Sequence, residues 1–202
     1  MVKKLFPQFE KNISVAFTPM VLTARMIKRD HPDCKVVFIG PCDSKKLEAR
    51  RQSVRSDVDF VLTFEEALGI FAAKGMDKAF LPEDEEELPA YSSRDARRFA
   101  YSGGVAQAVV NAIHDMDPER EVKVAAATGL ADCRKLLMMA KAGKRNGYLL
   151  EGMGCPGGCV AGAGTITPVR ESTLNVEKFK KEAAEVSSTA SPYVDRLKDV
   201  EE

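Results

Sequence analysis

The chain has 202 residues, 45% of them hydrophobic, which is enough for one domain with a sizeable core. Its 30 basic and 30 acidic residues give a formal net charge of zero, so neither nucleic acid nor an anionic membrane is an expected partner. The start "MVKKLFPQFEKN" lacks the apolar core of a signal peptide, and no apolar run reaches the roughly 18 residues of a membrane-spanning helix. We therefore expect a cytoplasmic protein.

Strands alternate with helices in the first half of the chain. "NISVAF" alternates apolar and polar residues as a strand does, and Thr18 can then cap a helix with Pro19 in its first turn. "KVVFIG" is a continuous apolar run, typical of a buried parallel strand, and leads directly into "PCDSKKLEARR". "VDFVLT" is a second such strand. Thr63 and Glu66 then form a capping box, and Gly75 ends that helix.

The second half repeats this pattern after an acidic run at 83–87, which we expect to be a solvated loop. "SGGVAQAVVNAIHDM" is apolar at helical spacing. "EVKVAAATG", "LADCRKLLMMAKAGK" and "GYLLEGM" predict a strand, a helix and a strand, which is a βαβ unit. "VEKFKKEAAEV" predicts a surface helix. The expected fold is α/β, with mainly parallel sheets, flanking helices and two βαβ-type lobes around a cysteine-lined crevice.

The five cysteines, an odd number in a chain of this length, argue against a secreted disulfide scaffold. Cys42 follows the strand "VVFIG"; Cys155 follows "YLLEG", with Cys159 close behind it in "CPGGC". Because ligands gather at the carboxyl ends of parallel strands, we expect these three thiols to converge. Thiolates on bare glycine backbone suit a soft metal or a bulky cluster, whose anionic ligands glycine N–H groups can meet. The alternative is a glycine-rich turn whose cysteines happen to be close, with or without a labile disulfide.

Lys45 lies three residues after Cys42, so both side chains can lie on one face of a helix. There the ammonium can donate to an anionic ligand, whereas Lys46 points about 100° away and is expected to face solvent. The alternative is that both lysines only decorate a charged surface. The remaining cysteines and both histidines are assigned structural roles: Cys34, Cys133, His31 and His114.

Taken together, these stretches resemble the [FeFe]-hydrogenases. "PCDSKKLE" resembles the second cysteine signature of that family, and "EGMGCPGGCVAGAG" resembles the third. "YSGGVAQAV" resembles the glycine-rich helix start between them, and the resemblance spans nearly the whole chain. It implies the C-terminal catalytic domain of the large subunit, which ligates the H-cluster, a [4Fe–4S] cube joined to a two-iron subcluster. The implied reaction is the reversible reduction of protons to dihydrogen.

Position by position, the resemblance implies a role for each matching residue. Cys42 and Cys155 match ligands of the cube, and Cys159 matches the cysteine that also bridges to the two-iron unit. Lys45 matches a lysine that donates to a cyanide, and Met153 matches a methionine beside the two-iron unit. A further pair resembles the Ser-Pro pair that lines the same pocket: Thr18 and Pro19.

The sequence also departs from the family pattern. The first signature, threonine-serine-cysteine-cysteine-proline, is absent, and with it the fourth cube ligand and the proton-relaying cysteine. The N-terminal ferredoxin-like domains are absent too, so we interpret residues 1–202 as a partial C-terminal domain. Gly40 stands where many members have methionine, and "GAGTITP" lacks the usual glycine-glutamine-proline ending. With Thr-Pro-Met at 18–20, this drift resembles a proposed sensory branch of the family.

We therefore expect a fragment that is inactive by itself and carries no bound cofactor after preparation in air. By resemblance, its partners are the remainder of the hydrogenase chain, an electron-transfer protein such as ferredoxin, and maturation factors. Two alternatives to a hydrogenase fragment are a relative that binds an ordinary [4Fe–4S] cluster and a sensory or interaction module without metal.

Overall fold

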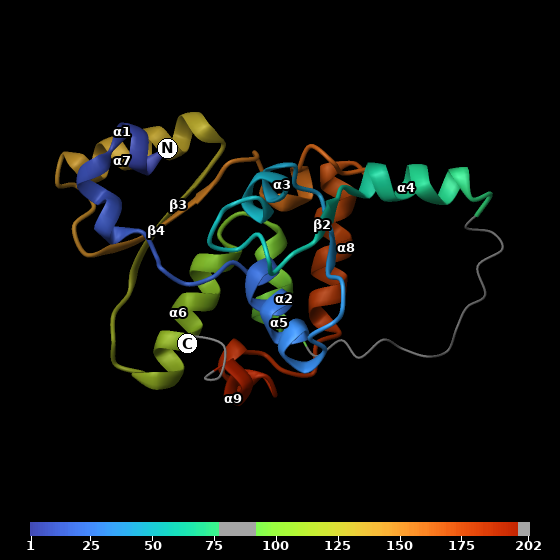
Figure 1. Cartoon of the computed structure of the whole chain (residues 1–202). Coiled ribbons are helices and arrows are strands. Elements are labelled where there is room, and N and C mark those ends of the chain that lie inside the picture. The colour runs from blue at the N-terminus through green and yellow to red at the C-terminus, as the bar shows by residue number, and fades with distance from the viewer. Residues whose placement is uncertain (77–91, 198–202) are drawn as a thin grey trace. The chain divides into compact units, whose positions relative to one another are not determined.

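The computed structural model describes residues 1–76 and 92–197 (Figure 1). The chain forms two compact units that are interleaved along the sequence. The first unit comprises Met1–Ala16, Ser92–Val160 and Thr173–Ser191, and the second comprises Phe17–Tyr91, Ala161–Ser172 and Pro192–Glu202. In the described part of the chain, no helix combines the length and the apolar character needed to cross a membrane. The acidic run at 83–87 lies outside the described residues.

A two-stranded parallel sheet organises the second unit. Its strands pair in register with Val37 opposite Phe60 and Ile39 opposite Leu62. Both strands were predicted from their apolar runs, and the connecting helix lies where "PCDSKKLEARR" places it. The elements of this unit are α2 (Pro19–Asp30), β1 (Val37–Ile39), α3 (Ser44–Ala49), β2 (Phe60–Leu62), α4 (Phe64–Ala73) and α9 (Val194–Leu197).

The core of the second unit lies between α2 and one face of this sheet. Val21 and Ala24 of α2 are each only 1% exposed, and Val54 and Val58 pack with them. The strands contribute partly buried side chains, among them Phe38. Burying these apolar side chains against one another is what fixes α2 over the strands.

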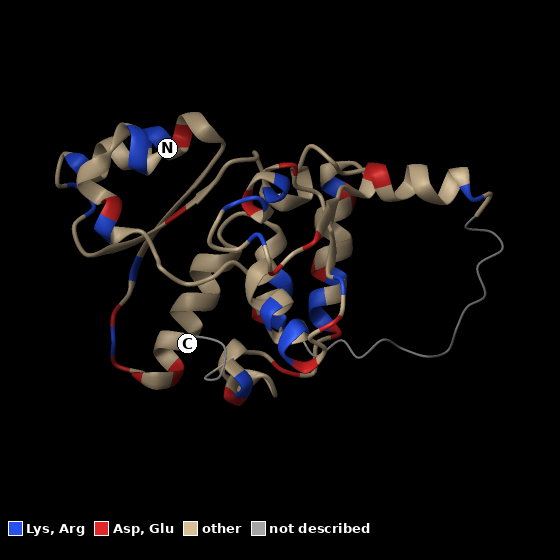
Figure 2. Cartoon of the chain, viewed as in Figure 1, with Lys and Arg blue, Asp and Glu red and all other residues tan. Residues whose placement is uncertain are grey.

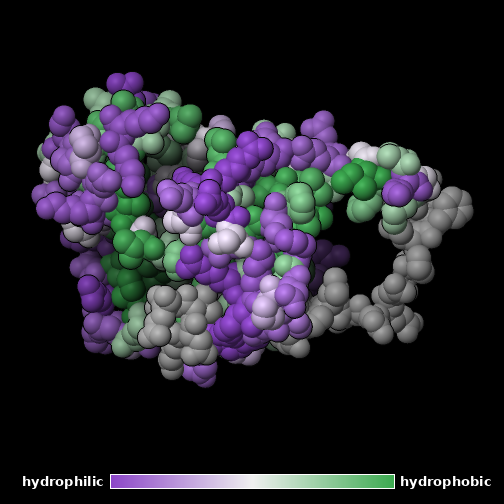
Figure 3. Space-filling model, viewed as in Figure 1, coloured by the Kyte–Doolittle hydropathy of each residue, from purple (hydrophilic) through white to green (hydrophobic). Residues whose placement is uncertain are grey.

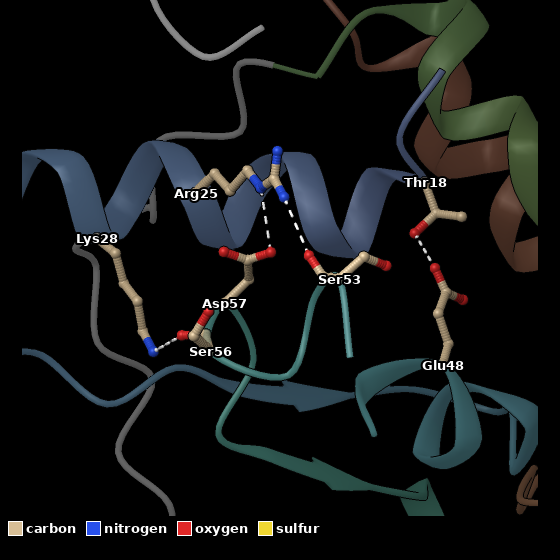
Figure 4. Close-up of polar contacts among 7 residues, drawn as sticks. All are labelled: Thr18, Arg25, Lys28, Glu48, Ser53, Ser56 and Asp57. Atoms are coloured by element: carbon tan, nitrogen blue, oxygen red, sulfur yellow. Dashed lines mark hydrogen bonds and ion pairs between the residues drawn. The ribbon is translucent and has the colours of Figure 1, made fainter. Parts of the chain in front are cut away.

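Polar contacts join α2 to the segment between α3 and β2 (Figure 4). Arg25 Nε donates to the Asp57 carboxylate over 3.0 Å, and its guanidinium also reaches the Ser53 carbonyl oxygen at 3.4 Å. Lys28 Nζ donates to the Ser56 carbonyl oxygen over 2.6 Å. Basic residues of α2 are accordingly interspersed with acidic neighbours in Figure 2. The segment that leads into β2 is therefore tied to α2 by side-chain as well as apolar contacts.

The opposite face of this sheet, together with α4, exposes apolar side chains. Val37, Ile39 and Phe60 are 47%, 49% and 60% exposed. Ile70 and Phe71 of α4 are similarly exposed, and hydrophobic surface covers this helix in Figure 3. Parallel sheets are ordinarily covered on both faces, so this outer face of the β1–β2 sheet is unusual.

The first unit is built on the predicted βαβ unit. β3 and β4 run parallel, in register from the pair Lys123 and Tyr148 to the pair Thr128 and Met153, with α7 between them in sequence. The elements are α1 (Val2–Leu5), a 3₁₀ helix η1 (Pro7–Asn12), α5 (Arg94–Arg97), η3 (Arg98–Ala100), α6 (Gly104–Met116), β3 (Lys123–Thr128), α7 (Leu130–Lys141), β4 (Tyr148–Met153), η4 (Cys159–Ala161), α8 (Val169–Lys181) and η5 (Ser188–Ala190). Residues of α8 from Thr173 onward belong to this unit.

Two predicted elements differ from the structure. The strand expected in "NISVAF" does not form: this segment follows the end of η1, and Val15 is 98% exposed. There the Ser14 hydroxyl accepts a hydrogen bond from the nearby Ala16 N–H, a local contact that competes with strand pairing. The last predicted helix is displaced, because α8 begins just after Pro168, whose carbonyl oxygen accepts from Ser172 N–H, and ends at Lys181.

Candidate metal centre

Cys42 lies in the loop between β1 and α3 of the second unit and is partly buried. The glycine tail at 162–164 packs against this loop. Gly164 N–H donates to the Pro41 carbonyl oxygen over 3.1 Å, and a Cβ on Gly162 would lie 2.2 Å from the same oxygen. Only glycine fits at position 162 without moving the backbone of the loop. The glycine tail of the third cysteine signature therefore contacts the residue next to Cys42.

Gly40 also fits closely into the strand end that precedes Cys42. A Cβ there would lie 2.7 Å from Cε1 of the Phe38 ring. Phe38 packs against the core of the second unit. A larger residue at position 40 would therefore have to displace this ring. Packing against Phe38 thus explains locally why this chain has glycine where many members of the family have methionine.

Lys45 and Thr18 meet on one carboxylate, that of Glu48. Lys45 Nζ lies 2.7 Å from Glu48 Oε2, and the Thr18 hydroxyl donates to Glu48 Oε1 over 2.5 Å (Figure 4). Burial by itself would raise the pKa of the Glu48 carboxyl, but the hydrogen bonds from Lys45 and Thr18 outweigh it, so the pKa lies below its ordinary value. Glu48 is therefore an anion that holds two residues of the predicted site in place.

One expectation for this region needs correction. Thr18 is the residue before α2, but its side chain makes no capping hydrogen bond, because its hydroxyl donates to Glu48 instead. Lys46, expected to face solvent, lies at the surface, where its Nζ is 2.6 Å from the Glu66 carboxylate and 3.5 Å from that of Asp43. The capping box of Thr63 and Glu66 forms as predicted.

Cys155 and Cys159 follow β4, which ends at the partly buried Met153. They are thiols rather than a disulfide. We call residues 155–159 the cysteine loop. Its turn depends on two glycines at positive φ, +98° at Gly157 and +100° at Gly158, a conformation that side-chain-bearing residues rarely adopt.

Thr128, at the end of β3, anchors the cysteine loop. Its hydroxyl donates to the Cys155 carbonyl oxygen over 3.1 Å and accepts from Gly157 N–H over 2.7 Å. Gly158 N–H donates to the Cys155 carbonyl oxygen over 3.0 Å. The expectation that glycine N–H groups point at an anionic ligand is therefore wrong for Gly157 and Gly158, whose N–H groups bind within the protein.

The segment at 101–102 lies directly against the cysteine loop. Ser102 N–H donates to the Gly157 carbonyl oxygen over 3.1 Å. A Cβ on Gly158 would lie 2.6 Å from Tyr101 Cα, a distance that real side chains do not adopt. The backbone of Tyr101 and Ser102 therefore forms one wall of the loop, and Gly158 has no room for a side chain.

Glu151 of β4 holds the start of α6 beside that wall. Its carboxylate accepts from Gly103 N–H and from Ala106 N–H, each over 2.6 Å. A carboxylate at a helix N-terminus satisfies N–H groups that lack partners within the helix and complements the helix dipole. Gly103 has a φ of +83°, a conformation that glycine adopts readily, and Glu151 binds the N–H groups of this turn.

Cys133 is a core residue, as predicted. It is 9% exposed, and its Sγ lies 3.5 Å from the Met153 carbonyl oxygen. Burial raises the pKa of the thiol, which makes it a poor nucleophile and a poor ligand at neutral pH. His114 contacts the Arg120 carbonyl oxygen through Nε2 at 3.1 Å, in line with a structural role.

Each unit carries part of the predicted site. Thr18, Pro19, Cys42 and Lys45 belong to the second unit, and Met153, Cys155 and Cys159 belong to the first. Among the described residues, no group of three or more His, Cys, Asp or Glu side chains lies together as a metal site. The convergence of the three thiols therefore stays a prediction.

The donor chemistry of the two loops fits an iron–sulfur cluster. Both present thiols, the ligand type that such clusters use, after the carboxyl ends of parallel strands. Cys159 is exposed, so its thiol is accessible from solvent. Sequence reasoning missed the residues that hold these loops: Glu48, Tyr101, Thr128 and Glu151. Of these, only Glu48 had a signal, its position three residues after Lys45 on a helix.

Comparison with curated proteins finds hydrogenases and assembly factors. The chain is 30% identical over 172 residues to the periplasmic [Fe] hydrogenase large subunit of Nitratidesulfovibrio vulgaris, covering 70% of this chain and 41% of that protein. It is 27% identical over 222 residues to iron hydrogenase 1 of Clostridium pasteurianum, covering 87% and 38%. It is also 26% identical over 128 residues to the cytosolic Fe-S cluster assembly factor NAR1 of Kluyveromyces lactis, covering 59% and 27%. The chain thus spans less than half the length of these relatives.

Comparison with solved structures supports the fold. A variant of the [FeFe]-hydrogenase HydA1 from Chlamydomonas reinhardtii superposes with a TM-score of 0.74 at 21% identity, covering 98% of this chain and 68% of that one. The family model described as "Iron only hydrogenase large subunit, C-terminal domain" matches residues 1–163. This match covers the loop of Cys42, the cysteine loop and the glycine-rich helix start between them. The chain therefore belongs to the family of the iron-only hydrogenase large subunit, C-terminal domain.

Proposed function

We propose that this chain is part of an [FeFe]-hydrogenase catalytic domain in which Cys42, Cys155 and Cys159 ligate an iron–sulfur cluster. The reaction of such a domain is the reversible reduction of protons to dihydrogen. When bound, the cluster supplies the redox chemistry, while the protein supplies thiolate ligands, hydrogen bonds and exclusion of water. With three of the expected four thiolate ligands, the 202-residue chain is inactive by itself.

The contact between the glycine tail and the Cys42 loop is the observation that carries this proposal. Gly162 packs against the Pro41 carbonyl oxygen, next to Cys42 in sequence. Cys159 precedes Gly162 by three residues, and three residues of extended chain span at most about 11 Å. The covalent chain therefore limits how far the Cys159 thiol can lie from the loop of Cys42, as a shared cluster requires.

Lys45 and Met153 are proposed to serve the two-iron part of the cluster, and Thr18 and Pro19 to line the same pocket. The ion pair with Glu48 holds the Lys45 ammonium in one place while no anion is bound. Burying a lone ammonium is costly, and Glu48 removes that cost. An anionic ligand such as cyanide could then share the ammonium with Glu48. The wider partners of this proposal are the rest of the hydrogenase domain, maturation factors and an electron donor such as ferredoxin, in the cytoplasm.

The test is anaerobic reconstitution of the reduced chain with ferrous iron and sulfide, followed by iron and sulfide analysis. Wild-type protein should bind a [4Fe–4S]-type cluster, with about four iron atoms per chain. Cys42→Ser, Cys155→Ser and Cys159→Ser should each lose most of this iron. Cys34→Ser is the matched control and should keep it, because Cys34 lies outside both loops. Full iron retention in Cys42→Ser would show that the two loops do not share a cluster.

A second candidate is an iron–sulfur protein that is not a hydrogenase, which the similarity to the assembly factor NAR1 favours. Infrared spectroscopy separates the two after co-expression with hydrogenase maturation factors and the rest of the domain. Bands from CO and cyanide, lost in Lys45→Ala but not in Lys46→Ala, support the hydrogenase. A bound cluster without such bands supports the second candidate, and no cluster at all supports a sensory or interaction module.

A further inference from the structure

Helix α8 lies outside the residues that the family model matches, yet it contacts the segment beside the cysteine loop. The match ends at residue 163, and α8 begins at Val169. The Tyr101 hydroxyl donates to the Glu177 carboxylate, and Lys180 Nζ donates to the Tyr101 hydroxyl over 3.2 Å. Lys180 and Glu177 are themselves an ion pair, with Nζ and Oε2 2.6 Å apart. The hydroxyl of Tyr101 is therefore held from both sides by charged groups of one helix.

The protonation states of Tyr101, Glu177 and Lys180 agree with these hydrogen bonds. Burial and the hydrogen bond to Glu177 raise the pKa of Tyr101, so its hydroxyl keeps its proton at neutral pH. The hydrogen bond from Lys180 lowers the pKa of Glu177, and the hydrogen bond to Glu177 raises the pKa of Lys180. A neutral donor, an anion and a cation are thus the stable forms. Hydrogen bonds to charged groups are stronger than those between neutral groups.

Helix α8 has a second attachment that does not involve Tyr101. Arg97 Nη1 donates to the Phe179 carbonyl oxygen over 2.5 Å, and its guanidinium lies 3.8 Å from the centroid of the Phe179 ring. Arg97 is 9% exposed, so this attachment is buried. The helix therefore has a fixed position from which Glu177 and Lys180 can hold Tyr101.

The backbone of Tyr101 is in turn the wall against which the cysteine loop packs. Gly158 has no space for a side chain next to Tyr101 Cα, and Ser102 N–H binds the Gly157 carbonyl oxygen. We propose that Tyr101, held by Glu177 and Lys180 of α8, is a positioning residue that fixes the conformation of the cysteine loop. Releasing its hydroxyl loosens the wall and lets the loop open.

The consequence for cluster binding rests on the proposed function, whereas the effect on the loop does not. The first experiment therefore uses the metal-free, reduced full chain. Cys155 is partly buried, so its rate of alkylation by iodoacetamide, followed by mass spectrometry, reports on opening of the loop. Lys180→Met should raise this rate about five-fold, the effect of losing one hydrogen bond to the Tyr101 hydroxyl. Tyr101→Phe removes that bond and the one to Glu177, and should raise the rate at least as much. The rate at Cys133 should not change.

Matched variants of α8 provide the controls. Lys181 is exposed and its side chain makes no hydrogen bond or ion pair with the described residues, so Lys181→Met should leave the rate at Cys155 unchanged. Lys180→Arg keeps a cationic donor and should restore a rate close to that of wild type. The double variant Tyr101→Phe, Lys180→Met should react no faster than Tyr101→Phe, because that single change already removes both hydrogen bonds of the hydroxyl.

Two results would overturn the inference. One is an unchanged rate at Cys155 in Tyr101→Phe or, if that variant does not fold, in Lys180→Met. The other is equal acceleration at Cys133, which would indicate general loss of stability. A reconstituted cluster should also be lost about five-fold faster from Lys180→Met than from Lys181→Met in air. If wild-type protein binds no cluster, the proposed function fails while the alkylation rates still decide the role of Tyr101.

Discussion

At the scale of single residues, the two cysteine loops are held by side chains that carry no ligand atom of their own. Thr128 binds the Cys155 carbonyl oxygen and Gly157 N–H. The Glu48 carboxylate accepts hydrogen bonds from both Lys45 and Thr18. Each of these contacts satisfies a polar group that would otherwise be partly buried without a partner. The geometry of the thiols thus depends on neighbours that a comparison of ligand residues alone does not include.

Gly158 should tolerate no side chain. Gly158→Ala combines a φ of +100° with a Cβ that would lie 2.6 Å from Tyr101 Cα, so we expect a loss of about 3 kcal/mol in the free energy of unfolding. Gly154→Ala is the matched control: its Cβ would meet only Leu130 Cδ2, at 3.9 Å, and should cost less than about 1 kcal/mol. Urea unfolding followed by circular dichroism measures both values. Equal stability of the two variants would contradict the packing described here.

Glu48 should contribute stability that depends on pH. Its pKa in the folded protein lies below the ordinary value of 4.5, so its contribution is complete above about pH 4.5 and is lost as the pH falls through the lower folded value. Glu48→Gln should therefore be less stable than wild type at pH 7, with the difference narrowing below pH 4.5. Urea unfolding from pH 7 to pH 3 measures this. Glu119→Gln, at an exposed position, is the control.

At the scale of elements, most of the fold could be predicted because its signals are local. The runs "KVVFIG" and "VDFVLT" are apolar without alternation, which predicts strands buried on both faces. In the structure only one face packs against α2, while Val37, Ile39 and Phe60 stay exposed on the other. Both cysteine loops were placed correctly after strands because apolar runs are local signals. The prediction for "NISVAF" was wrong because alternation also arises in an exposed segment, where the Ser14 hydroxyl accepts a hydrogen bond from Ala16 N–H. The roles of Thr128 and Tyr101 could not be predicted, since they depend on strand pairing and on α8, far away in sequence.

The capping box at the start of α4 is the clearest local signal and can be tested directly. The Thr63 hydroxyl accepts from Glu66 N–H over 3.1 Å, and Glu66 accepts from Thr63 N–H over 2.8 Å. Thr63→Ala should cost about 1 kcal/mol of unfolding free energy, whereas Thr63→Ser keeps the hydroxyl and should cost clearly less. Thermal unfolding monitored by circular dichroism compares the two. A serine variant as unstable as the alanine variant would mean that packing of the threonine methyl group, rather than the cap, is responsible.

At the scale of the whole molecule, the two units are interleaved in sequence, so neither is a continuous piece of chain. The first unit needs α8, because this helix contacts the buried Arg97 and binds the Tyr101 hydroxyl. Ala183, just beyond the end of α8, is also buried. The family model stops before these residues. Its boundary is therefore a boundary of sequence similarity rather than of a folded unit.

A chain shortened to residues 1–168 should accordingly lose the fold of its first unit. Ending the chain at residue 168 leaves the Arg97 guanidinium without the Phe179 carbonyl oxygen, and it also removes η5, which packs against α5 and α6. Hydrogen exchange followed by mass spectrometry should show lost protection in α6. A chain that ends at Leu197 keeps every described residue and is the control. Wild-type protection of α6 in the shorter chain would show that α8 is dispensable.

The exposed outer face of the β1–β2 sheet bears on how the protein behaves at high concentration. Val37, Ile39 and Phe60 form an apolar surface on a chain whose positive and negative charges cancel. Long-range repulsion between molecules is then weak, so contact between such surfaces on two molecules is not prevented by charge. Salts that are excluded from protein surfaces, such as sulfate, strengthen this attraction further. Light scattering that rises with sulfate, and less so after Phe60→Lys, would identify this face as the one that limits solubility.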